Sequence, residues 1–333
     1  MEQPKLLLAP FKGLTGRRYR NAFSRHFGGF DAMYAPFISG FGHSKINPSK
    51  LEDVVPVEAN LAPTVPQFLS TNAREIILFG KTLQQLGYDH INWNMGCPFA
   101  HIADKKRGCG LLPYPDELEQ ILNDVFMDLP VKLSIKTRLG YFSHHEIYRI
   151  IEVLNQFPIS LLIIHARTGT QIYSGEVNID AFSDCLSLSK NPLAYNGDIY
   201  HKLRFAEMRS RFPEIKTWML GRGSLINPFL AMEIKGNFFS ESEKREKLNA
   251  FLNEMLDTGM ETGQNPTRLL GYMKAVWFYI SGLFANPGLI FSAIKTTVNL
   301  TAYKKMVDFN LAQPLSSEAG IEEYFRKGVK HLG

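Results

Sequence analysis

The sequence predicts a closed (β/α)8 barrel followed by a small, all-helical C-terminal domain. Eight short apolar runs alternate with helix-like segments through residues 1–240. Several of these runs end in polar or charged residues, as expected where an active site forms at the carboxyl ends of barrel strands. Beyond residue 240 the alternation stops, and only helix-like segments follow. The expected division is therefore a barrel over residues 1–240 and a helical domain over residues 241–333.

The predicted strands are short and apolar on both faces, which is typical of a parallel sheet covered by helices. They are Lys5–Pro10, Asp31–Pro36, Val65–Leu69, His90–Asn94, Val131–Thr137, Leu161–Ala166, Leu193–Asn196 and Thr217–Leu220. An open, doubly wound sheet is the alternative, but no G-x-G-x-x-G follows an early strand. The closed barrel is therefore preferred.

Helices are expected between these strands. They are Gly16–Phe27, Ala73–Leu86, Asp116–Phe126, His145–Phe157, Ile179–Leu188 and Lys202–Phe212. Asn72 and Pro115 are helix-start signals before two of them. No element is assigned between Pro36 and Val65.

Four further helices are expected in the C-terminal domain, in an up-and-down arrangement. They are Glu241–Thr262, Arg268–Leu283, Leu289–Phe309 and Ile321–His331. The segments between them contain proline, as in Asn265-Pro266, Asn286-Pro287 and Gln313-Pro314.

Composition narrows the class of protein. The chain has 333 residues, is 45% hydrophobic and carries a net charge of +5. Its apolar runs are too short to cross a membrane, and its first residues do not resemble a secretory signal, so a cytoplasmic protein is expected. Three cysteines are too few for a disulfide framework. Basic residues cluster between Lys5 and Arg25 and again at Lys105–Arg107. Such clusters either hold a phosphate backbone or form a solvated face.

Glycine-rich turns follow the last two predicted strands. Asn196-Gly197-Asp198 ends one strand, and Gly221-Arg222-Gly223-Ser224 follows the next. Glycine lets backbone N–H groups approach a phosphate, and arginine adds a charged donor. Since barrels often hold phosphates at this place, the two turns together favour a phosphate-bearing ligand over ordinary turn chemistry.

Cations recur on neighbouring strands. Lys136 and Arg138 alternate on one strand and so share one face, and His165 and Arg167 repeat the pattern. Such groups either pair with internal acids, of which Asp198 is the main candidate, or meet an anionic ligand. A flavin fits this lining, with its phosphate at Arg222 and its pyrimidine edge at Lys136.

Cys97 lies on the turn Asn94-Met95-Gly96-Cys97-Pro98, directly after a predicted strand. A zinc site is disfavoured because the spacing of Cys97, His101 and Cys109 matches no usual pattern, so no metal is expected. The thiol is either an inert buried group or an acid-base or nucleophilic group. A thiol pKa of about 8.5 favours a proton donor, and an electron-rich reduced flavin nearby would raise that pKa further.

These residues together resemble the tRNA-dihydrouridine synthase family, in order, across essentially the whole barrel. The resembling stretches include Leu8-Ala9-Pro10-Phe11, Gln67, Asn94-Met95-Gly96-Cys97-Pro98, Gly108-Cys109-Gly110-Leu111-Leu112, Lys136-Thr137-Arg138, His165-Ala166-Arg167-Thr168, Gln171-Ile172-Tyr173-Ser174-Gly175, Asn196-Gly197-Asp198 and Gly221-Arg222-Gly223. The resemblance implies an FMN enzyme that reduces the C5=C6 bond of a tRNA uridine, with NADPH as electron donor and the helical domain recognising tRNA.

The resemblance also implies a role for each matching residue. Cys97 would be the catalytic proton donor. The residues expected to bind FMN are Pro10, Phe11, Gln67, Lys136, His165, Asn196, Gly197, Asp198, Gly221 and Arg222. Asn94, Arg138 and Tyr173 would hold the uracil, and Arg167 would lie near the RNA or the flavin.

Two other functions are compatible with parts of this pattern. An FMN barrel that reduces a free pyrimidine or another small enone would share the phosphate site but would not need the helical domain. A catalytically silent tRNA-binding relative is disfavoured by the presence of Cys97, Lys136 and Arg222.

A monomer is expected. Departures from the family's usual residues at Phe11, Gly16, Ala35-Pro36 and Asn178 bear on which uridine is targeted.

Overall fold

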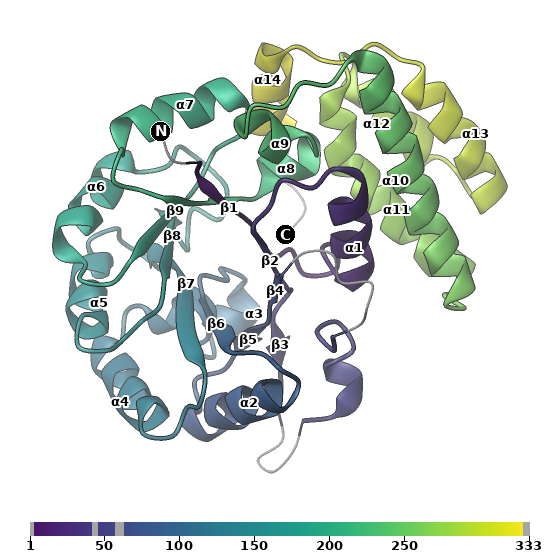
Figure 1. Cartoon of the computed structure of the whole chain (residues 1–333). Helices are drawn as coiled ribbons and strands as arrows, with labels where there is room; N and C mark the ends of the chain where they lie inside the picture. The colour runs from purple at the N-terminus through teal and green to yellow at the C-terminus, as the bar shows by residue number, and fades with distance from the viewer. Residues whose placement is uncertain (1–2, 42–45, 57–62, 329–333) are drawn as a thin grey trace.

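The computed structural model describes residues 3–41, 46–56 and 63–328. Its core is a ring of parallel strands enclosed by helices, viewed along the barrel axis in Figure 1. The strands are β1 (Lys5–Leu8), β2 (Ala32–Tyr34), β3 (Ile38–Ser39), β4 (Thr64–Val65), β5 (Gln67–Leu69), β6 (His90–Met95), β7 (Lys132–Gly140), β8 (Leu162–Thr168), β9 (Leu193–Asn196) and β10 (Thr217–Leu220). The last strand, β10, pairs with β1, so the predicted barrel is confirmed.

The described residues form ten strand segments where eight were predicted, because one predicted strand is split and one short strand was not predicted. The predicted strand Val65–Leu69 is interrupted by Pro66, whose missing N–H breaks the ladder. The first piece, β4, pairs with β2, whereas the second, β5, pairs with β3 and β6. The prediction of a single strand over Val65–Leu69 is therefore wrong, and the short β3 lies in the stretch for which no element was predicted.

Helices cover the outside of the ring. They are α1 (Arg17–His26), α2 (Ala73–Gln85), α4 (Pro115–Phe126), α5 (Glu146–Leu154), α6 (Ile179–Leu188) and α7 (Lys202–Arg211), as predicted within a few residues. Asn72 caps α2 by accepting a hydrogen bond from the Glu75 N–H, and Pro115 is the first residue of α4. Short helical segments also occur in the loops: η1 (Pro48–Lys50), α3 (Ala100–Ala103) and η2 (Gly108–Leu111).

Two short helices that the sequence did not predict follow the last strand. They are α8 (Arg222–Ile226) and α9 (Leu230–Ile234). All residues of α8 are buried. They therefore lack the polar face that marks an amphipathic helix in a sequence.

The C-terminal region is helical, as predicted, and lies beside the barrel (Figure 1). It contains α10 (Glu241–Glu261), α11 (Pro266–Ile280), η3 (Ser281–Leu283), α12 (Pro287–Lys295), α13 (Leu300–Leu311) and α14 (Glu318–Gly328). The single helix predicted over Leu289–Phe309 is wrong. The first helix ends at Lys295, and a second begins after Asn299, whose side chain caps α13 by accepting a hydrogen bond from the Ala302 N–H. The end of the last predicted helix, residues 329–331, lies outside the described residues.

Much of the basic N-terminal cluster contributes to the contact between barrel and helical region. Arg25 pairs with Glu254 on α10, whereas the buried Arg20 pairs within the barrel, with Asp53 at 3.0 Å. Arg18 donates to Gln264 at 2.7 Å and lies over the ring of Tyr272. These arginines stabilise the fold and are not free for a ligand.

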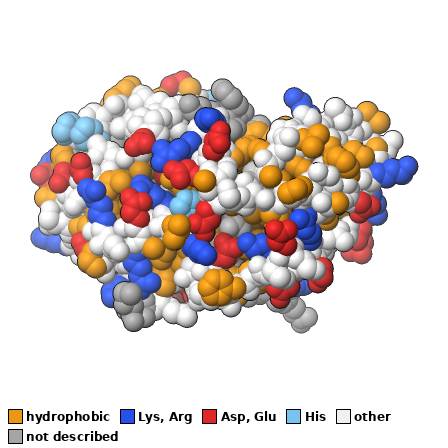
Figure 2. Space-filling model, turned by 90° about the horizontal axis from the view of Figure 1, so that it is seen from above, with side chains coloured by type: hydrophobic (Ala, Val, Ile, Leu, Met, Phe, Trp, Pro, Cys, Tyr) orange, Lys and Arg blue, Asp and Glu red, His pale blue; other side chains and the backbone are white. Residues whose placement is uncertain are grey.

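One face of the molecule carries mixed charge. Figure 2 shows acidic and basic side chains interspersed, with hydrophobic side chains more abundant on the right, over the helical region. Among the described residues, no helix has both the length and the hydropathy needed to cross a membrane.

Candidate active site

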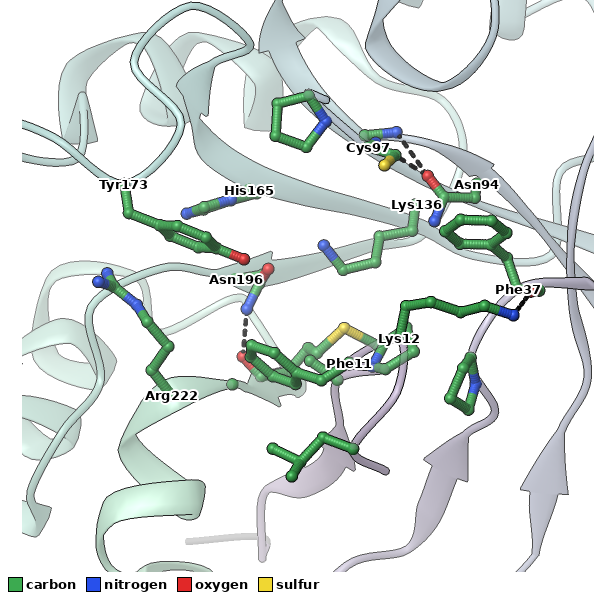
Figure 3. Close-up of a pocket in the computed structure, with 18 of the residues that line it drawn as sticks. Phe11, Lys12, Phe37, Asn94, Cys97, Lys136, His165, Tyr173, Asn196 and Arg222 are labelled. Atoms are coloured by element: carbon green, nitrogen blue, oxygen red, sulfur yellow. Dashed lines mark hydrogen bonds between the residues drawn. The ribbon is translucent and has the colours of Figure 1, made fainter. Parts of the chain in front are cut away.

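A cavity of about 550 Å³ opens at the carboxyl ends of the barrel strands. Nearly all of the predicted site residues line this cavity, and they come from different strands. Those that line it are Pro10, Phe11, Gln67, Asn94, Cys97, Lys136, Arg138, His165, Tyr173, Asn196, Gly197, Asp198, Gly221 and Arg222. Arg167 is the one predicted residue outside this lining. In Figure 3, Cys97 and Asn94 lie on one side, Tyr173 and Arg222 on the other, and the Lys136 amino group points between them.

A chain of amide side chains holds the Cys97 turn. The Asn94 side-chain oxygen accepts from the backbone N–H groups of Cys97 at 2.9 Å and Gly96 at 3.1 Å. Its amide nitrogen donates to Gln67 at 2.8 Å, and Gln67 donates to Asn92 at 2.7 Å. The three amide side chains are buried, so each of these hydrogen bonds takes the place of one to water. The predicted cofactor residue Gln67 and the predicted substrate residue Asn94 thus also position the thiol.

The glycine-rich stretch after Cys97 folds back onto the cysteine. Gly108 has φ +58°, and a β-carbon there would lie 2.6 Å from the Cys97 carbonyl oxygen. Cys109 donates through both its N–H and its thiol to the same oxygen, each at 3.1 Å. Glycine at position 108 is therefore needed for this stretch to pack against the Cys97 backbone, and Cys109 has a structural role here.

Cys97 lies against the apolar side chains of Leu69 and Ile102 and is 7% exposed. Burial raises the pKa of the Cys97 thiol, although a backbone hydrogen bond at Phe99 and the charges of Arg138 and Lys136 oppose this. The thiol is therefore protonated at neutral pH. Among the described residues, no cluster of His, Cys, Asp or Glu has the arrangement of a metal site.

Lys136 carries an amino group with no hydrogen-bond partner among the described residues, and it projects into the cavity (Figure 3). Burial, together with the neighbouring charge of Arg138, lowers the pKa of Lys136 to about 7. An amino group left unpaired inside a barrel is ready to bind an electron-rich ligand atom.

Arg138 joins the two loops that flank the cavity. Its Nε donates to the Gly96 carbonyl at 3.0 Å, and its Nη1 donates to the carbonyls of Thr168 and Ile172, both at 2.7 Å. The guanidinium thus ties the cysteine turn to the loop that carries Tyr173. Nη2 makes no hydrogen bond within the described part of the chain, which leaves it for a ligand.

Arg167 lies behind the cavity wall and acts on its neighbours. It binds Asp198 through two nitrogens, at 2.7 and 2.5 Å, and donates to the Gly175 carbonyl at 2.8 Å. It also approaches Nε2 of His165 at 3.3 Å. Because arginine only donates, Nε2 is the acceptor and the proton lies on Nδ1. Burial, reinforced by the surrounding cations, lowers the pKa of His165 well below its ordinary value, so the imidazole is neutral.

The glycine turns after β9 and β10 form the far end of the cavity. Arg222 is 7% exposed and donates to Asp198 at 3.1 Å. A β-carbon on Gly223 would lie 2.0 Å from the Ile199 carbonyl oxygen, so the two turns approach backbone to backbone. Asn196 donates to the Met219 carbonyl at 2.8 Å and thereby bridges the two strands. With more cationic than acidic side chains, this end suits a phosphate.

Several lining residues were not predicted as site residues from the sequence. Lys12 and Phe37 meet at the mouth, where the Lys12 amino group lies 5.3 Å from the Phe37 ring centroid and donates to its carbonyl. Their position beside predicted strand ends was an available signal. Tyr279 and Phe325 come from α11 and α14. No local pattern links these two residues to a barrel cavity.

The fold places the chain among the (β/α)8 barrels. It superposes on histamine dehydrogenase from Rhizobium sp. 4-9 with a TM-score of 0.53 and 12% identity, covering 70% of this chain and 45% of that protein. Morphinone reductase gives a TM-score of 0.51 and 10% identity over 71% of this chain and 87% of that one. At these identities the likeness concerns the fold alone.

Sequence comparison defines the family. A sequence model of the dihydrouridine synthase family (Dus) matches residues 7–303, and the chain belongs to this family of oxidoreductases. It is 30% identical over 298 residues to tRNA-dihydrouridine synthase B of Pasteurella multocida, covering 85% of this chain and 86% of that protein. A probable tRNA-dihydrouridine synthase of Aquifex aeolicus is 27% identical over 75% of this chain and 79% of that one. The family predicted from the sequence is confirmed.

Proposed function

We propose that this protein reduces the C5=C6 bond of a uridine in tRNA to 5,6-dihydrouridine, with FMN as its flavin, NADPH as electron donor and Cys97 as proton donor. Family membership and relatives named tRNA-dihydrouridine synthase B support the substrate. The observation that carries the assignment of roles is the cavity itself, where a protonated thiol and an unpaired lysine face a ring of cations.

The cavity residues fit FMN. Arg222 and the turns at Gly197-Asp198 and Gly221 would hold the phosphate, with Asn196 beside them. The Lys136 amino group would meet the electron-rich edge of the flavin ring, with Gln67 and His165 nearby. Pro10 and Phe11 would pack against the ring. FMN supplies hydride chemistry once NADPH has reduced it, and the protein supplies placement and a proton.

The reduction adds a hydride to C6 of uracil and a proton to C5. Negative charge develops on C5 and O4 as the hydride adds, so a nearby acid lowers the barrier. Cys97 is protonated at neutral pH, and its S–H would give the proton to C5. Asn94, the remaining Nη2 of Arg138 and the ring of Tyr173 would hold the uracil. For Arg167 we propose a positioning role, through Asp198 and His165.

A stacked uridine cannot reach the cavity, so it must be flipped out of the tRNA. We propose that the region 241–333 forms a separate tRNA-recognition domain beside the catalytic barrel of residues 1–240. We also propose that the protein acts as a monomer.

Replacing Cys97 tests this assignment. We expect Cys97→Ala to retain its flavin absorption bands but to form dihydrouridine at least about 10²-fold more slowly, because a general acid contributes roughly that much. Dihydrouridine in purified tRNA is quantified by mass spectrometry under single-turnover conditions.

The matched control is Cys185→Ala, which removes a buried thiol on α6 away from the cavity. It should leave the rate unchanged. Full activity of Cys97→Ala would remove Cys97 from the acid role. If the wild-type protein reduced free uridine but left tRNA unchanged, it would be a small-molecule reductase.

A further inference from the structure

We propose that α14 is a clamp on the phosphate end of the flavin site, acting through Phe325, which holds the Arg222 guanidinium in place. This inference rests on the proposed FMN function and adds a positioning residue from the helical region. Phe325 is 5% exposed and lines the same cavity as the glycine turns.

Arg222 lies over two aromatic rings. Its guanidinium carbon is 4.2 Å from the centroid of Phe325 and 4.5 Å from that of Tyr173. Figure 3 shows the Tyr173 side of this arrangement. Cation-π attraction is strongest when the cation is shielded from water, as Arg222 is here. The two rings therefore limit the rotamers that the arginine can adopt while its N–H groups stay available at the ring edges.

Ion pairs and hydrogen bonds connect α14 to two barrel loops near the Arg222 guanidinium. Arg326 binds Glu176, on the loop that carries Tyr173, at 2.8 Å. It also donates to Tyr200, on the loop after β9, at 3.2 Å, and Tyr200 donates to Glu322 at 2.7 Å. Arg222, at the start of α8, supplies the third contact. The helix thus touches each loop that forms the phosphate end.

The opposite side of α14 is fixed to the helical region. The Tyr324 hydroxyl donates to the Phe278 carbonyl at 2.5 Å and lies 3.2 Å from the Ser281 hydroxyl. A β-carbon on Gly282 would lie 2.1 Å from the Tyr324 ring, so no larger residue fits between them. Because α14 is bound on both sides, the position of the helical region is coupled to the position of Arg222.

A held arginine binds phosphate more tightly than a mobile one because less side-chain entropy is lost on binding. Removing the Phe325 ring should therefore weaken FMN binding about tenfold, in the range expected for a shielded cation-π contact. Riboflavin lacks the phosphate, so its affinity should not change.

The test is a fluorescence titration of the flavin-free protein with FMN and, separately, with riboflavin. The variants are Phe325→Ala and Phe325→Leu, the second of which keeps most of the apolar volume that anchors α14. Both should weaken FMN about tenfold and leave riboflavin unchanged. The matched control is Phe309→Ala on α13, where the ring is 42% exposed and remote from the cavity lining. It should bind both flavins like the wild type.

Unchanged FMN affinity in Phe325→Leu and Phe325→Ala would overturn the clamp while leaving the proposed function intact. Equal weakening of FMN and riboflavin in both variants would also overturn it, since the effect would then not act through the phosphate. If the wild-type protein bound neither flavin, the proposed function itself would fail, and the clamp with it.

Discussion

At the scale of single residues, the site is an unusual concentration of positive charge. Lys136, Arg138 and Arg222 line a cavity in which Asp198 is the only acidic lining residue among those described, and Arg167 lies behind its wall. Arginine keeps its charge when buried, whereas lysine and histidine give up their protons. The neutral His165 and the lowered pKa of Lys136 follow from burial, reinforced by this crowding of positive charge. The site is thus prepared for a ligand that brings negative charge.

We predict that FMN binding takes up a proton at Lys136. Its pKa of about 7 in the flavin-free protein leaves the amine mostly neutral at about pH 8. The electron-rich flavin edge favours the charged form and raises that pKa, so the amine gains a proton on binding. Below about pH 6 the amine is already protonated, and the uptake should disappear.

Calorimetry in two buffers with different ionisation enthalpies measures this proton. The binding heat should differ between the buffers at about pH 8, approaching one proton per FMN. In Lys136→Met the difference should vanish. Identical heats for the wild type in both buffers would contradict the prediction.

At the scale of elements, the two strands that carry the cations, β7 and β8, extend further than predicted. β7 runs to Gly140 and β8 to Thr168, so Arg138 and Arg167 lie inside the strands, as their alternation with Lys136 and His165 predicted. Strand alternation is interrupted by a register shift between Arg138 and Gly140. A side chain on a strand is held more firmly than one on a loop. Because Arg138 is held on a strand, its guanidinium can bridge the two loops that flank the cavity.

We predict that Gly223→Ala damages both fold and cofactor site. Its β-carbon would meet the Ile199 carbonyl at 2.0 Å, and backbone on both sides cannot move away cheaply. We expect a loss of about 2 kcal/mol or more in the free energy of unfolding, together with weakened FMN binding. Urea denaturation and flavin titration measure these two effects.

Gly271→Ala is the matched control. Gly271 lies in α11, and a β-carbon there meets nothing within 4 Å. Alanine should stabilise the protein by roughly 0.5–1 kcal/mol because it restricts the unfolded chain and favours helix. Equal stability of the two variants would refute the close-approach argument.

At the scale of the whole molecule, the basic residues divide into two groups. The N-terminal group is largely used internally, as shown by Arg20 with Asp53 and Arg25 with Glu254. Lys105 and Arg107, on the loop after the cysteine turn, make no ion pair within the described residues. This loop follows the carboxyl end of β6, at the same end of the barrel as the cavity. These two cations are therefore better placed to meet an RNA backbone.

We predict that the double variant Lys105→Ala with Arg107→Ala binds tRNA more weakly and with a smaller dependence on salt. For every phosphate that the variant no longer neutralises, the slope of log affinity against log salt should fall by about 0.7 to 0.9. Filter binding at several salt concentrations measures the slope. Lys81→Ala with Lys132→Ala removes the same amount of positive charge, from two exposed ion pairs elsewhere on the surface, and should leave the slope unchanged.

The sequence by itself determined the barrel, the helical region and most of the cavity lining. Apolar periodicity reports which residues are buried, and strand ends such as Asn94, Lys136 and Asn196 meet at one rim because the strands are parallel. Burial can be predicted from the local spacing of apolar residues, and the meeting of the strand ends follows from the parallel order of the strands.

Only the tertiary structure decided which residues act through others. Arg167 lies behind the wall, Asn94 holds the cysteine turn, and Phe325 reaches Arg222 from far along the chain. Contacts between distant segments depend on how helices pack and on where individual side chains find space. No local periodicity encodes that, because packing is a property of the whole folded chain.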